Sequence, residues 1–431
     1  MKYNYLTNNN LIIHDEETFT DYTRHSISDL LSYKTEYYRY DFNNGFRISF
    51  TDCSQDYYIV IRDKNTKYQY FRGIISPERN VIYSYEKKYF IEYEISIHMM
   101  NNNVPNCYPF EVITFDLYNK DILILISGSE DRCGLGDEIS WLQATVHFHN
   151  KYPKTNIYIC TSYSELNVLI KKFAPYLNII DYKSIKNKKF YATYLNGCFF
   201  NDTNRNYNPI DFRLQSLISM GYNVLGIEED KQNPALLFKY DTPKKEKPYV
   251  CIGVHASGIF KEWLPDEGEY ERLVDFLKNL GYDVYIIDKD EESKANNLIR
   301  TKIPSNAINL TGYYTLEERA KILSGADFFI GVSSGLSWLA WSVGIPVVLI
   351  SGFTNPITEF YTPYRVINYN KCNSCWNDYF KENIIENPCP RKCDIYKNDY
   401  LECTTSITSL MVIDKICKIP SVREKLNERN Q

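Results

Sequence analysis

One stretch, from Asp121 to Lys151, limits the folds open to this chain more than any other. Its first residues, Asp121–Ser127, form a short apolar run rich in isoleucine and leucine, typical of a strand buried on both faces of a parallel sheet. From Asp137 onward apolar residues recur at helical spacing, and Gly134 and Gly136 lie between the two segments. We therefore expect a strand, a glycine loop and a helix, and the start of such a helix readily binds an anion.

The alternation of strands and helices continues along the chain. The expected strands are Asn156–Cys160, Asn178–Asp181, Phe190–Tyr194, Tyr249–His255, Asp283–Ile287, Asp327–Ile330 and Pro346–Ile350. The expected helices are Ser164–Phe173, with Ser162 or Ser164 as N-cap, and Glu269–Leu280, Thr315–Leu323 and Leu336–Val343. The polar, proline-bounded segment Asp241–Pro248 separates two series of elements. We predict an α/β fold with two doubly wound Rossmann-like domains, 119–243 and 244–431, and a cleft at the carboxyl ends of both sheets.

Residues 1–118 have a different pattern. Short aromatic or β-branched segments alternate there with Asn, Asp, Gly or Pro turns, at Tyr37–Tyr40, Phe46–Phe50, Tyr57–Ile61, Tyr68–Phe71 and Phe90–Ile97. This pattern predicts a small antiparallel β domain, either a sandwich or a barrel. Its plainest interpretation is a packing or assembly domain.

Charge and hydropathy exclude several classes of protein. The net charge of −5 argues against a general nucleic-acid or anionic-membrane binder. No apolar run approaches the roughly 20 residues that a membrane span requires. The first residues are polar and lack the apolar core of a signal peptide. We expect a cytoplasmic protein with no nucleic-acid partner and no membrane span.

Asp137, at the end of the Gly134-Leu135-Gly136 loop, is the candidate catalytic base. Because no bulky side chain surrounds it on such a loop, its carboxylate can approach a substrate and take a proton from it. The alternative is that Asp137 only caps the helix.

Three later loops carry candidate binding residues. The residues concerned are His255, Ala256, Ser257 and Lys261 in the first loop, Thr311 and Gly312 in the second, and Ser333, Ser334, Gly335, Leu336 and Ser337 in the third. Lys261 would supply a compact positive charge to a diphosphate, or else be one more solvated lysine. The serine loop would bind an anion at a helix start, or else be a tight turn with Ser333 or Ser334 as N-cap. Thr311 and Gly312 would line a nucleotide pocket.

A cluster of cysteines near the C-terminus predicts a metal site. Its members are Cys372, Cys375, Cys389, Cys393 and Cys403. In a reducing compartment such clustering favours a metal over disulfides, and since no histidine follows His255 the ligands must all be cysteines, which suit zinc or iron. Cys403 precedes a helical pattern that would favour its thiolate, so we leave out Cys393. We predict a closed, structural metal finger with four cysteine ligands at 371–404.

Four segments carry a resemblance to a known family. They are RCGLGDEISWLQ, GVHASGIFKEWLP, ADFFIGVSSGLSWLAWSVGIPVVLISGFTNPITEF and CNSCWND with the cysteines after it. Together they resemble the bacterial autotransporter heptosyltransferases over roughly residues 120–415. A more distant similarity runs to the lipopolysaccharide heptosyltransferases, which share the two α/β domains, the GT-B layout, but lack the cysteine cluster. Those relatives carry Asp-Thr-Gly and a later His where this chain has Ser333-Ser334-Gly335 and Trp338, which favours the protein-modifying branch.

The resemblance implies a function and a set of residue roles. It implies a cytoplasmic enzyme that transfers heptose from ADP-heptose to serines in the passenger region of an autotransporter adhesin. Asp137 would be the base, Lys261 would hold the diphosphate, and the Ser333–Ser337 loop would bind the donor. A ferric ion (Fe3+) would be held by Cys372, Cys375, Cys389 and Cys403, with zinc as the alternative metal and Cys393 as an additional cysteine. The family also implies a large homo-oligomer.

We therefore predict a GT-B protein O-heptosyltransferase that works by a single displacement. Two alternatives stay open at this point. One is a glycosyltransferase that uses another sugar nucleotide or a lipopolysaccharide acceptor. The other is a non-catalytic scaffold whose four-cysteine finger binds a partner protein.

Overall fold

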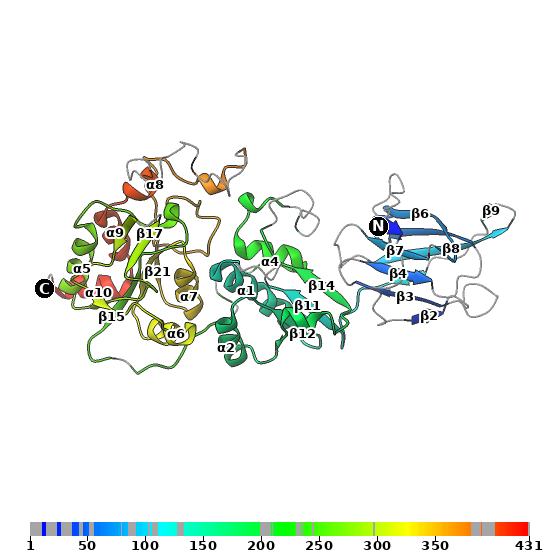
Figure 1. Ribbon diagram of the computed structural model, residues 1–431, viewed down its shortest axis with the longest axis horizontal. Coiled ribbons are helices and arrows are strands. Elements are labelled where there is room, and N and C mark those ends of the chain that lie inside the picture. The colour runs from blue at the N-terminus through cyan, green and yellow to red at the C-terminus, as the bar shows by residue number, and fades with distance from the viewer. Residues whose placement is uncertain are drawn as a thin grey trace.

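The protein is elongated, and its three groups of strands follow one another along the long axis (Figure 1). The computed structural model describes residues 11–13, 24–26, 37–42, 46–50, 56–78, 80–84, 92–101, 104–105, 111–126, 133–198, 208, 210–229, 234, 236–243, 245–295, 298–380, 389 and 401–429. The N-terminal strands lie at one end of the molecule and the last helices at the other.

The described part of residues 1–118 forms two antiparallel sheets. The first has the order β1 (Leu11–Ile13), β7 (Val81–Ser84), β4 (Arg47–Phe50), β3 (Tyr37–Asp41) and β2 (Arg24–Ser26). The second has the order β10 (Glu111–Ile113), β8 (Tyr93–Asn101), β5 (Tyr57–Asp63) and β6 (Gln69–Ile75), and β9 (Val104–Pro105) pairs with β8. Buried and half-buried residues alternate along β5, as expected of a strand with one face in a core. Phe42 joins these strands to the next part of the chain, because its N–H donates to the Tyr191 carbonyl at 2.8 Å.

The first parallel sheet contains the strand predicted from Asp121. Its order is β13 (Asn178–Ile179), β12 (Asn156–Cys160), β11 (Asp121–Leu125) and β14 (Ala192–Leu195), with all strands parallel. The helices of this part are α1 (Leu135–Lys151), α2 (Ser164–Phe173), α3 (Tyr182–Ile185) and α4 (Leu217–Leu225), and η3 (Phe212–Leu214) precedes α4. The predicted helix at 164–173 is confirmed, but its N-cap is Tyr163 and no side chain caps it, so the prediction of a serine cap is wrong.

The second parallel sheet has six strands. Its order is β19 (Ile308–Asn309), β16 (Asp283–Ile286), β15 (Tyr249–Gly253), β20 (Phe329–Val332), β21 (Val347–Ile350) and β22 (Arg365–Val366). Its helices are α5 (Glu269–Asn279), α6 (Leu316–Ser324), α7 (Gly335–Val343), α8 (Glu402–Thr405), α9 (Ser409–Ile416) and α10 (Pro420–Arg429), with short turns η4 (Ile259–Lys261) and η5 (Cys375–Asn377). A separate antiparallel pair consists of β17 (Glu292–Ala295) and β18 (Leu298–Lys302).

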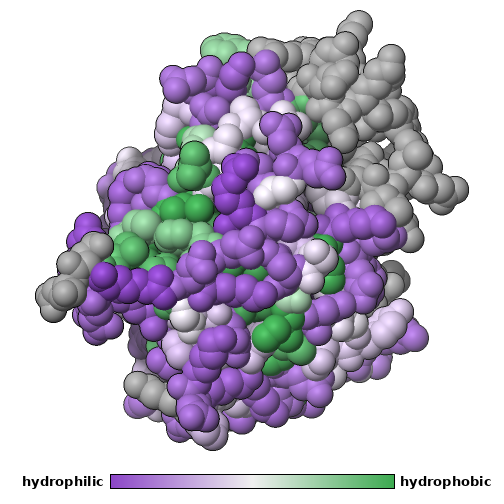
Figure 2. Space-filling model, turned by 90° about the vertical axis from the view of Figure 1, so that its left-hand side faces the viewer, coloured by the Kyte–Doolittle hydropathy of each residue, from purple (hydrophilic) through white to green (hydrophobic). Residues whose placement is uncertain are grey.

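Both faces of this second sheet are buried, which explains the apolar runs in its sequence. Cys251 and Phe329 belong to the core shared with the first sheet and the N-terminal strands, whereas Val250, Ile252 and Ile330 belong to a second core. Successive side chains of a strand point to opposite faces, so a strand between two layers of helices must be apolar at every position. The outer face at this end of the molecule is mainly hydrophilic with separate apolar patches (Figure 2). Within the described residues, none of the helices combines the length and hydropathy that crossing a bilayer requires.

Two predicted loops are shorter than expected. Helix α1 begins at Leu135 rather than Asp137, so Gly136 and Asp137 lie in its first turn. The predicted loop between the strand ending at Ile330 and the helix beginning at Leu336 shrinks to Ser333 and Ser334, because β20 extends to Val332 and α7 begins at Gly335. Gly136, Gly331 and Gly335, which we assigned to loops, therefore lie inside regular elements, whereas Gly134 is the N-cap of α1.

Close approach between helices explains one of these glycines. A Cβ placed on Gly136 would lie 2.4 Å from the Trp338 ring, closer than atoms in contact allow. Gly136 therefore permits the first turn of α1 to touch α7. This contact joins the part built on the first parallel sheet to the part built on the second, beside the cavity described below. These two parts are called the first half and the second half from here on.

Candidate functional site

A cavity of about 910 Å³ lies between the two parallel sheets, where a cleft was predicted. It is lined from the first half by the start of α1 and the segment after β14, and from the second half by the segments after β15, β20 and β21. The lining residues that we predicted are Gly134, Leu135, Gly136, Asp137, His255, Ala256, Ser257, Lys261, Ser333, Ser334, Gly335 and Leu336. Segments far apart in the sequence thus meet at the carboxyl ends of parallel strands, as is usual for ligand sites in such folds.

Asp137 both caps the first turn of α1 and lines the cavity. Its Oδ2 accepts a hydrogen bond from the Gly134 N–H at 2.9 Å, which closes the first turn of α1. It also lines the cavity. Burial raises the pKa of its carboxyl group, while the charge of Lys261 and the Gly134 hydrogen bond oppose the rise and the neighbouring Glu138 adds to it. A carboxylate with a raised pKa is a stronger base than an ordinary aspartate.

Lys261 contributes positive charge from the opposite half. It is the last residue of η4, and its N–H donates to the Gly258 carbonyl at 2.9 Å. Its effect on the pKa of Asp137 means that the two side chains are within electrostatic reach of each other. Trp263, two residues later, is fully buried and donates through Nε1 to the Ile407 carbonyl at 2.7 Å, so it anchors this segment.

The strand end before Lys261 is held by a carboxylate that the sequence did not indicate. Asp288 accepts hydrogen bonds from the N–H groups of Val254 at 2.8 Å and His255 at 3.2 Å. Asp288 is buried, and burial raises its pKa to about 7. His255 is half-buried with both ring nitrogens shielded from solvent, and burial lowers the pKa of its imidazole. This shift favours the neutral ring at the cavity wall.

The serine loop divides into residues that line the cavity and one that does not. Ser333 and Ser334 line it, whereas Ser337 is buried and donates to the Val332 carbonyl at 2.5 Å. Thr311 and Gly312 lie outside the lining. The Thr311 N–H donates to Asn309 Oδ1 at 2.8 Å, and the Gly312 N–H donates to the Lys289 carbonyl at 2.9 Å. Lys289 and Asp290, which the sequence did not single out, line the cavity.

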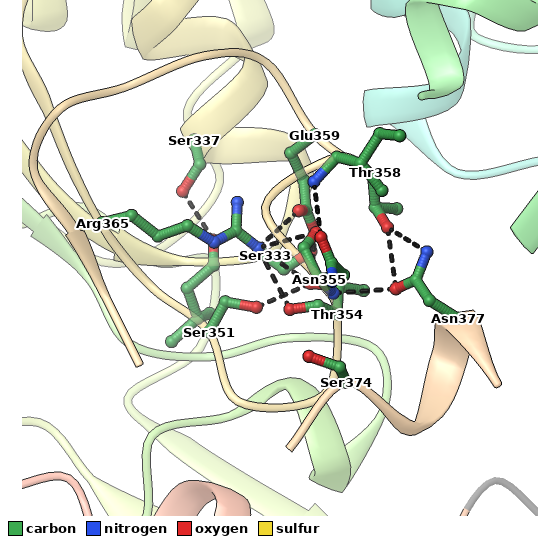
Figure 3. A network of polar contacts seen from close by, with 12 residues as sticks. Ser333, Ser337, Ser351, Thr354, Asn355, Thr358, Glu359, Arg365, Ser374 and Asn377 are labelled. Carbon is green, nitrogen blue, oxygen red and sulfur yellow. Dashed lines mark hydrogen bonds and ion pairs between the residues drawn. The ribbon is translucent and has the colours of Figure 1, made fainter. Parts of the chain in front are cut away.

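A buried polar network under the serine loop was missed from the sequence (Figure 3). The Glu359 carboxylate accepts from Ser333 Oγ at 2.5 Å, from Thr354 Oγ1 at 2.6 Å and from Arg365 Nη2 at 2.7 Å. Glu359 and Arg365 are both almost fully buried. The ion pair fixes the Ser333 hydroxyl at the cavity wall, since that hydroxyl donates its hydrogen to Glu359. The only sequence signal was the position of these residues just after the apolar β21 run.

The same network reaches the cysteine segment. The Asn377 carboxamide accepts from the Asn355 N–H at 2.7 Å and donates to the Arg213 carbonyl at 2.9 Å, so it links the segment after β21 to the first half. The Ser374 N–H donates to the Gly352 carbonyl at 2.7 Å. Ser374 has a positive φ of 60°, consistent with a tight turn between Cys372 and Cys375.

Four of the five clustered cysteines lie in the described part of the chain, and three of them affect the fourth, Cys403. Burial raises the pKa of Cys403 to about 12, and the thiols of Cys372, Cys375 and Cys389 add to the rise. Helix α8 begins at Glu402, so Cys403 lies in the first turn of a helix as expected, while burial holds the pKa of its thiol above the ordinary value. Cys393 lies outside the described residues.

Whether the cysteine set can hold a metal depends on its chemistry and on its arrangement. A set of four thiols suits iron or zinc in its chemistry. Among the residues that the structure describes, however, no group of three or more His, Cys, Asp or Glu side chains is arranged to hold a metal ion.

Fold and site together define a class of protein. Two facing parallel sheets, with a carboxylate from one half and a lysine from the other in a shared cavity, have the arrangement of a GT-B glycosyltransferase. The model of glycosyltransferase family 9 (heptosyltransferase) matches residues 220–388. The crystal structure of TibC, an iron-containing dodecameric glycosyltransferase of enterotoxigenic E. coli, has a TM-score of 0.74 and 29% identity over 89% of this chain and 95% of TibC.

Sequence relatives identify the family. The autotransporter heptosyltransferase Aah of Escherichia coli is 34% identical over 350 residues, covering 79% of this chain and 82% of Aah. The autotransporter heptosyltransferase TibC of Escherichia coli is 32% identical over 388 residues, covering 88% of this chain and 89% of TibC. The chain therefore belongs to the autotransporter heptosyltransferases, and it is a glycosyltransferase. One relative, BimC of Burkholderia thailandensis, is an inactive autotransporter heptosyltransferase with 30% identity over 90% of this chain and 87% of its own length.

Proposed function

We propose that this protein transfers a heptose from ADP-heptose to serine hydroxyls in the passenger of an autotransporter adhesin. The observation that carries the proposal is that Asp137 and Lys261 reach the same cavity from opposite halves. A base and a positive charge on two sides of one cavity suit a displacement in which a nucleophile enters from one side and a diphosphate leaves on the other. TibC has been crystallised with ADP-D-β-D-heptose, which supports this donor.

Each step has a candidate residue. Asp137 takes the proton from the serine hydroxyl as its oxygen bonds to the anomeric carbon. The bond between that carbon and the diphosphate oxygen breaks in the same step, and ADP leaves with the electron pair. Lys261 neutralises the charge that develops on the diphosphate. Backbone N–H groups at the start of α7, beside Ser334 and Gly335, are suited to the same anion.

The orientation of Ser333 changes its proposed role. Its only hydroxyl hydrogen is donated to Glu359, so the oxygen presents lone pairs to the cavity. A phosphate oxygen also offers only lone pairs. We therefore assign phosphate binding to Lys261 and the backbone of the serine loop. Ser333 would instead accept a hydrogen bond from a hydroxyl group of the sugar nucleotide.

The remaining finer assignments belong to the same proposal. We divide the chain into an N-terminal β domain at 1–118, an acceptor-side domain at 119–243 and a donor-binding domain at 244–431. Within the last, Cys372, Cys375, Cys389 and Cys403 would hold a structural ion, and the iron of TibC favours iron over zinc. When bound, such an ion would cross-link the finger. A large homo-oligomer is proposed by the same analogy, because TibC is a dodecamer.

An inactive relative gives weight to the alternative of a non-catalytic scaffold. The test is to incubate the purified protein with ADP-heptose and the passenger region of an adhesin, and to measure the intact mass of the passenger. We expect mass increments of one heptose on serine-containing fragments. Hexose increments with another sugar nucleotide, or transfer only to lipopolysaccharide, would replace the substrate assignment. Absence of transfer and of donor hydrolysis with every sugar nucleotide tried would favour the scaffold.

A further inference from the structure

Asn196 is a buried side chain that the mechanism above does not use. It follows β14 directly, and its N–H donates to the Leu125 carbonyl at 3.0 Å, which extends the ladder between β11 and β14. Its side chain is 0% exposed and lines the cavity. Among the residues that the structure describes, neither Nδ2 nor Oδ1 of its carboxamide has a hydrogen-bond partner.

A second buried asparagine shows what a purely structural amide does in the same half. Asn208 is also buried, but its Nδ2 donates to the Met220 carbonyl and its Oδ1 accepts from the Ile210 N–H and from Gln215, all at 3.3 Å. A buried amide without partners destabilises a fold, because it loses its hydrogen bonds to water and gains none. Asn196 therefore serves something other than folding.

The chemistry of the free carboxamide limits what can bind it. It offers an acceptor oxygen and a donor N–H2 side by side, so its ligand must offer a donor and an acceptor at the same spacing. In an extended polypeptide the N–H and C=O of one residue point to the same side, which is how antiparallel strands exchange pairs of hydrogen bonds. A carboxamide can occupy the place of the neighbouring strand in such a pair.

The position of Asn196 favours binding of the acceptor polypeptide rather than of the sugar-nucleotide donor. Asn196 belongs to the first half, whereas Lys261 and the start of α7, which are proposed to bind the diphosphate, belong to the second. Two residues along, Cys198 also lines the cavity, and its thiol is within electrostatic reach of both Asp137 and Lys261. Asn196 thus lines the same cavity as Asp137 and Lys261, on the first-half wall rather than on the segments proposed to bind the diphosphate.

We propose that Asn196 is a positioning residue that binds the main chain of the acceptor polypeptide in extended conformation, at the serine that Asp137 deprotonates. This inference rests on the proposed function and names how the acceptor is recognised. Because the contact is with main-chain groups, serines with different neighbours in a repetitive passenger are all acceptable.

The test compares Asn196→Leu with the matched variant Asn208→Leu. Leucine has the same branched heavy-atom skeleton as asparagine, with bulkier methyl groups in place of the amide, so each change removes the amide and leaves no cavity. The probes are a synthetic peptide with one central serine and the same peptide N-methylated at that serine, which removes one main-chain donor. Peptide binding is measured by calorimetry without a sugar nucleotide, the midpoint of thermal unfolding is measured for each variant, and the KM for peptide and for ADP-heptose is measured during transfer.

We expect Asn196→Leu to bind the unmodified peptide roughly tenfold more weakly than the wild type, the effect of losing a buried hydrogen-bonded pair. N-methylation should weaken binding to the wild type and to Asn208→Leu but not to Asn196→Leu. The unfolding midpoint should stay the same or rise in Asn196→Leu and fall in Asn208→Leu. The KM for ADP-heptose should not change in either variant.

Three results would overturn the inference. The first is a fall in the unfolding midpoint of Asn196→Leu as large as that of Asn208→Leu, which would make the amide structural. The second is an unchanged peptide affinity, and the third is a raised KM for the donor. If the wild type binds peptide and ADP-heptose but transfers nothing, the proposed function fails, and the binding and unfolding measurements still decide the role of Asn196.

Discussion

The Gly134 N–H donates a hydrogen bond to Oδ2 of Asp137 at 2.9 Å, so the proposed base also closes the first turn of its own helix. The two interpretations of Asp137, as a cap and as a base, are therefore compatible. One carboxylate oxygen is held by the backbone, and this fixes the direction of the group in the cavity. A fixed base costs less to orient in the transition state.

Asp137→Asn should abolish transfer while keeping the fold. The side-chain oxygen of asparagine can still accept the Gly134 N–H, but the amide cannot take a proton. We expect the transfer rate to fall about a thousandfold, the usual size of a lost general base. ADP binding, measured by calorimetry, should be nearly unchanged. Most of the wild-type turnover in this variant would show that another group is the base.

The transfer rate should depend on pH through Asp137. Because burial raises its pKa, the base becomes protonated at a higher pH than an ordinary aspartate, and the rate should fall as the pH decreases through that raised value. Lys261 lowers the same pKa, so Lys261→Met should move the acidic limb of the kcat profile to higher pH. The measurement is kcat at saturating donor and acceptor over a pH series. An acidic limb at the same pH in the wild type and in Lys261→Met would show that Lys261 does not affect the pKa of Asp137.

The same shift predicts an effect on stability. The carboxyl pKa is raised in the folded state above its ordinary value of 3.8, so the folded protein holds this proton more firmly than the unfolded chain. The contribution to stability is present below 3.8 and is lost as the pH rises through the raised pKa. Asp137→Asn should remove this slope, which urea unfolding at several pH values would detect.

Gly136→Ala should push the two halves apart. The added Cβ would meet the Trp338 ring at 2.4 Å, so the first turn of α1 or the indole must move. We expect a loss of about 1–3 kcal/mol in unfolding free energy, typical of overpacking, together with slower transfer. Gly73→Ala is the control, because its Cβ would lie 3.0 Å from Phe71 in β6, away from the cavity. Equal transfer rates in the two variants would contradict the proposed role of the α1–α7 contact.

Glu359→Gln should expose the cost of an unpaired buried charge. Arg365 is 8% exposed and its Nη2 lies 2.7 Å from Glu359, so neutralising the carboxylate leaves a buried guanidinium without its counter-ion. We expect a loss of about 3 kcal/mol in the free energy of urea unfolding. The double variant Glu359→Gln with Arg365→Met should lose less than the sum of the single changes. Additive losses would mean that the pair does not interact.

The cysteine assignment predicts which thiols retain metal. Replacing Cys372, Cys375, Cys389 or Cys403 by serine should each lower the bound metal, whereas Cys393→Ser should not. Metal content by mass spectrometry gives the result directly, and visible absorption distinguishes ferric thiolate from colourless zinc. Loss of metal in Cys393→Ser with retention in Cys403→Ser would show that Cys393, and not Cys403, is the fourth ligand.

The sequence by itself determined the alternation of strands and helices and the main candidate functional residues of the cavity. Apolar runs at β11, β15, β20 and β21 and helical spacing in α1, α5 and α6 reflect burial on one or two faces, which each segment records locally. Asp137 and Lys261 could be selected because each follows a strand where parallel sheets place their ligands.

Only the tertiary structure decided which side chains meet. The Glu359–Arg365 pair, the anchoring of the strand end by Asp288 and the Asn196 amide, which is unpaired within the described residues, depend on how the chain packs, and no local pattern records them. It also decided that Thr311, Gly312 and Ser337 lie outside the cavity wall. At Gly136 it brings α1 so close to α7 that there is no room for a Cβ atom. Local sequence sets the burial and the period of an element, whereas the partner of a polar group is set by packing across the whole fold.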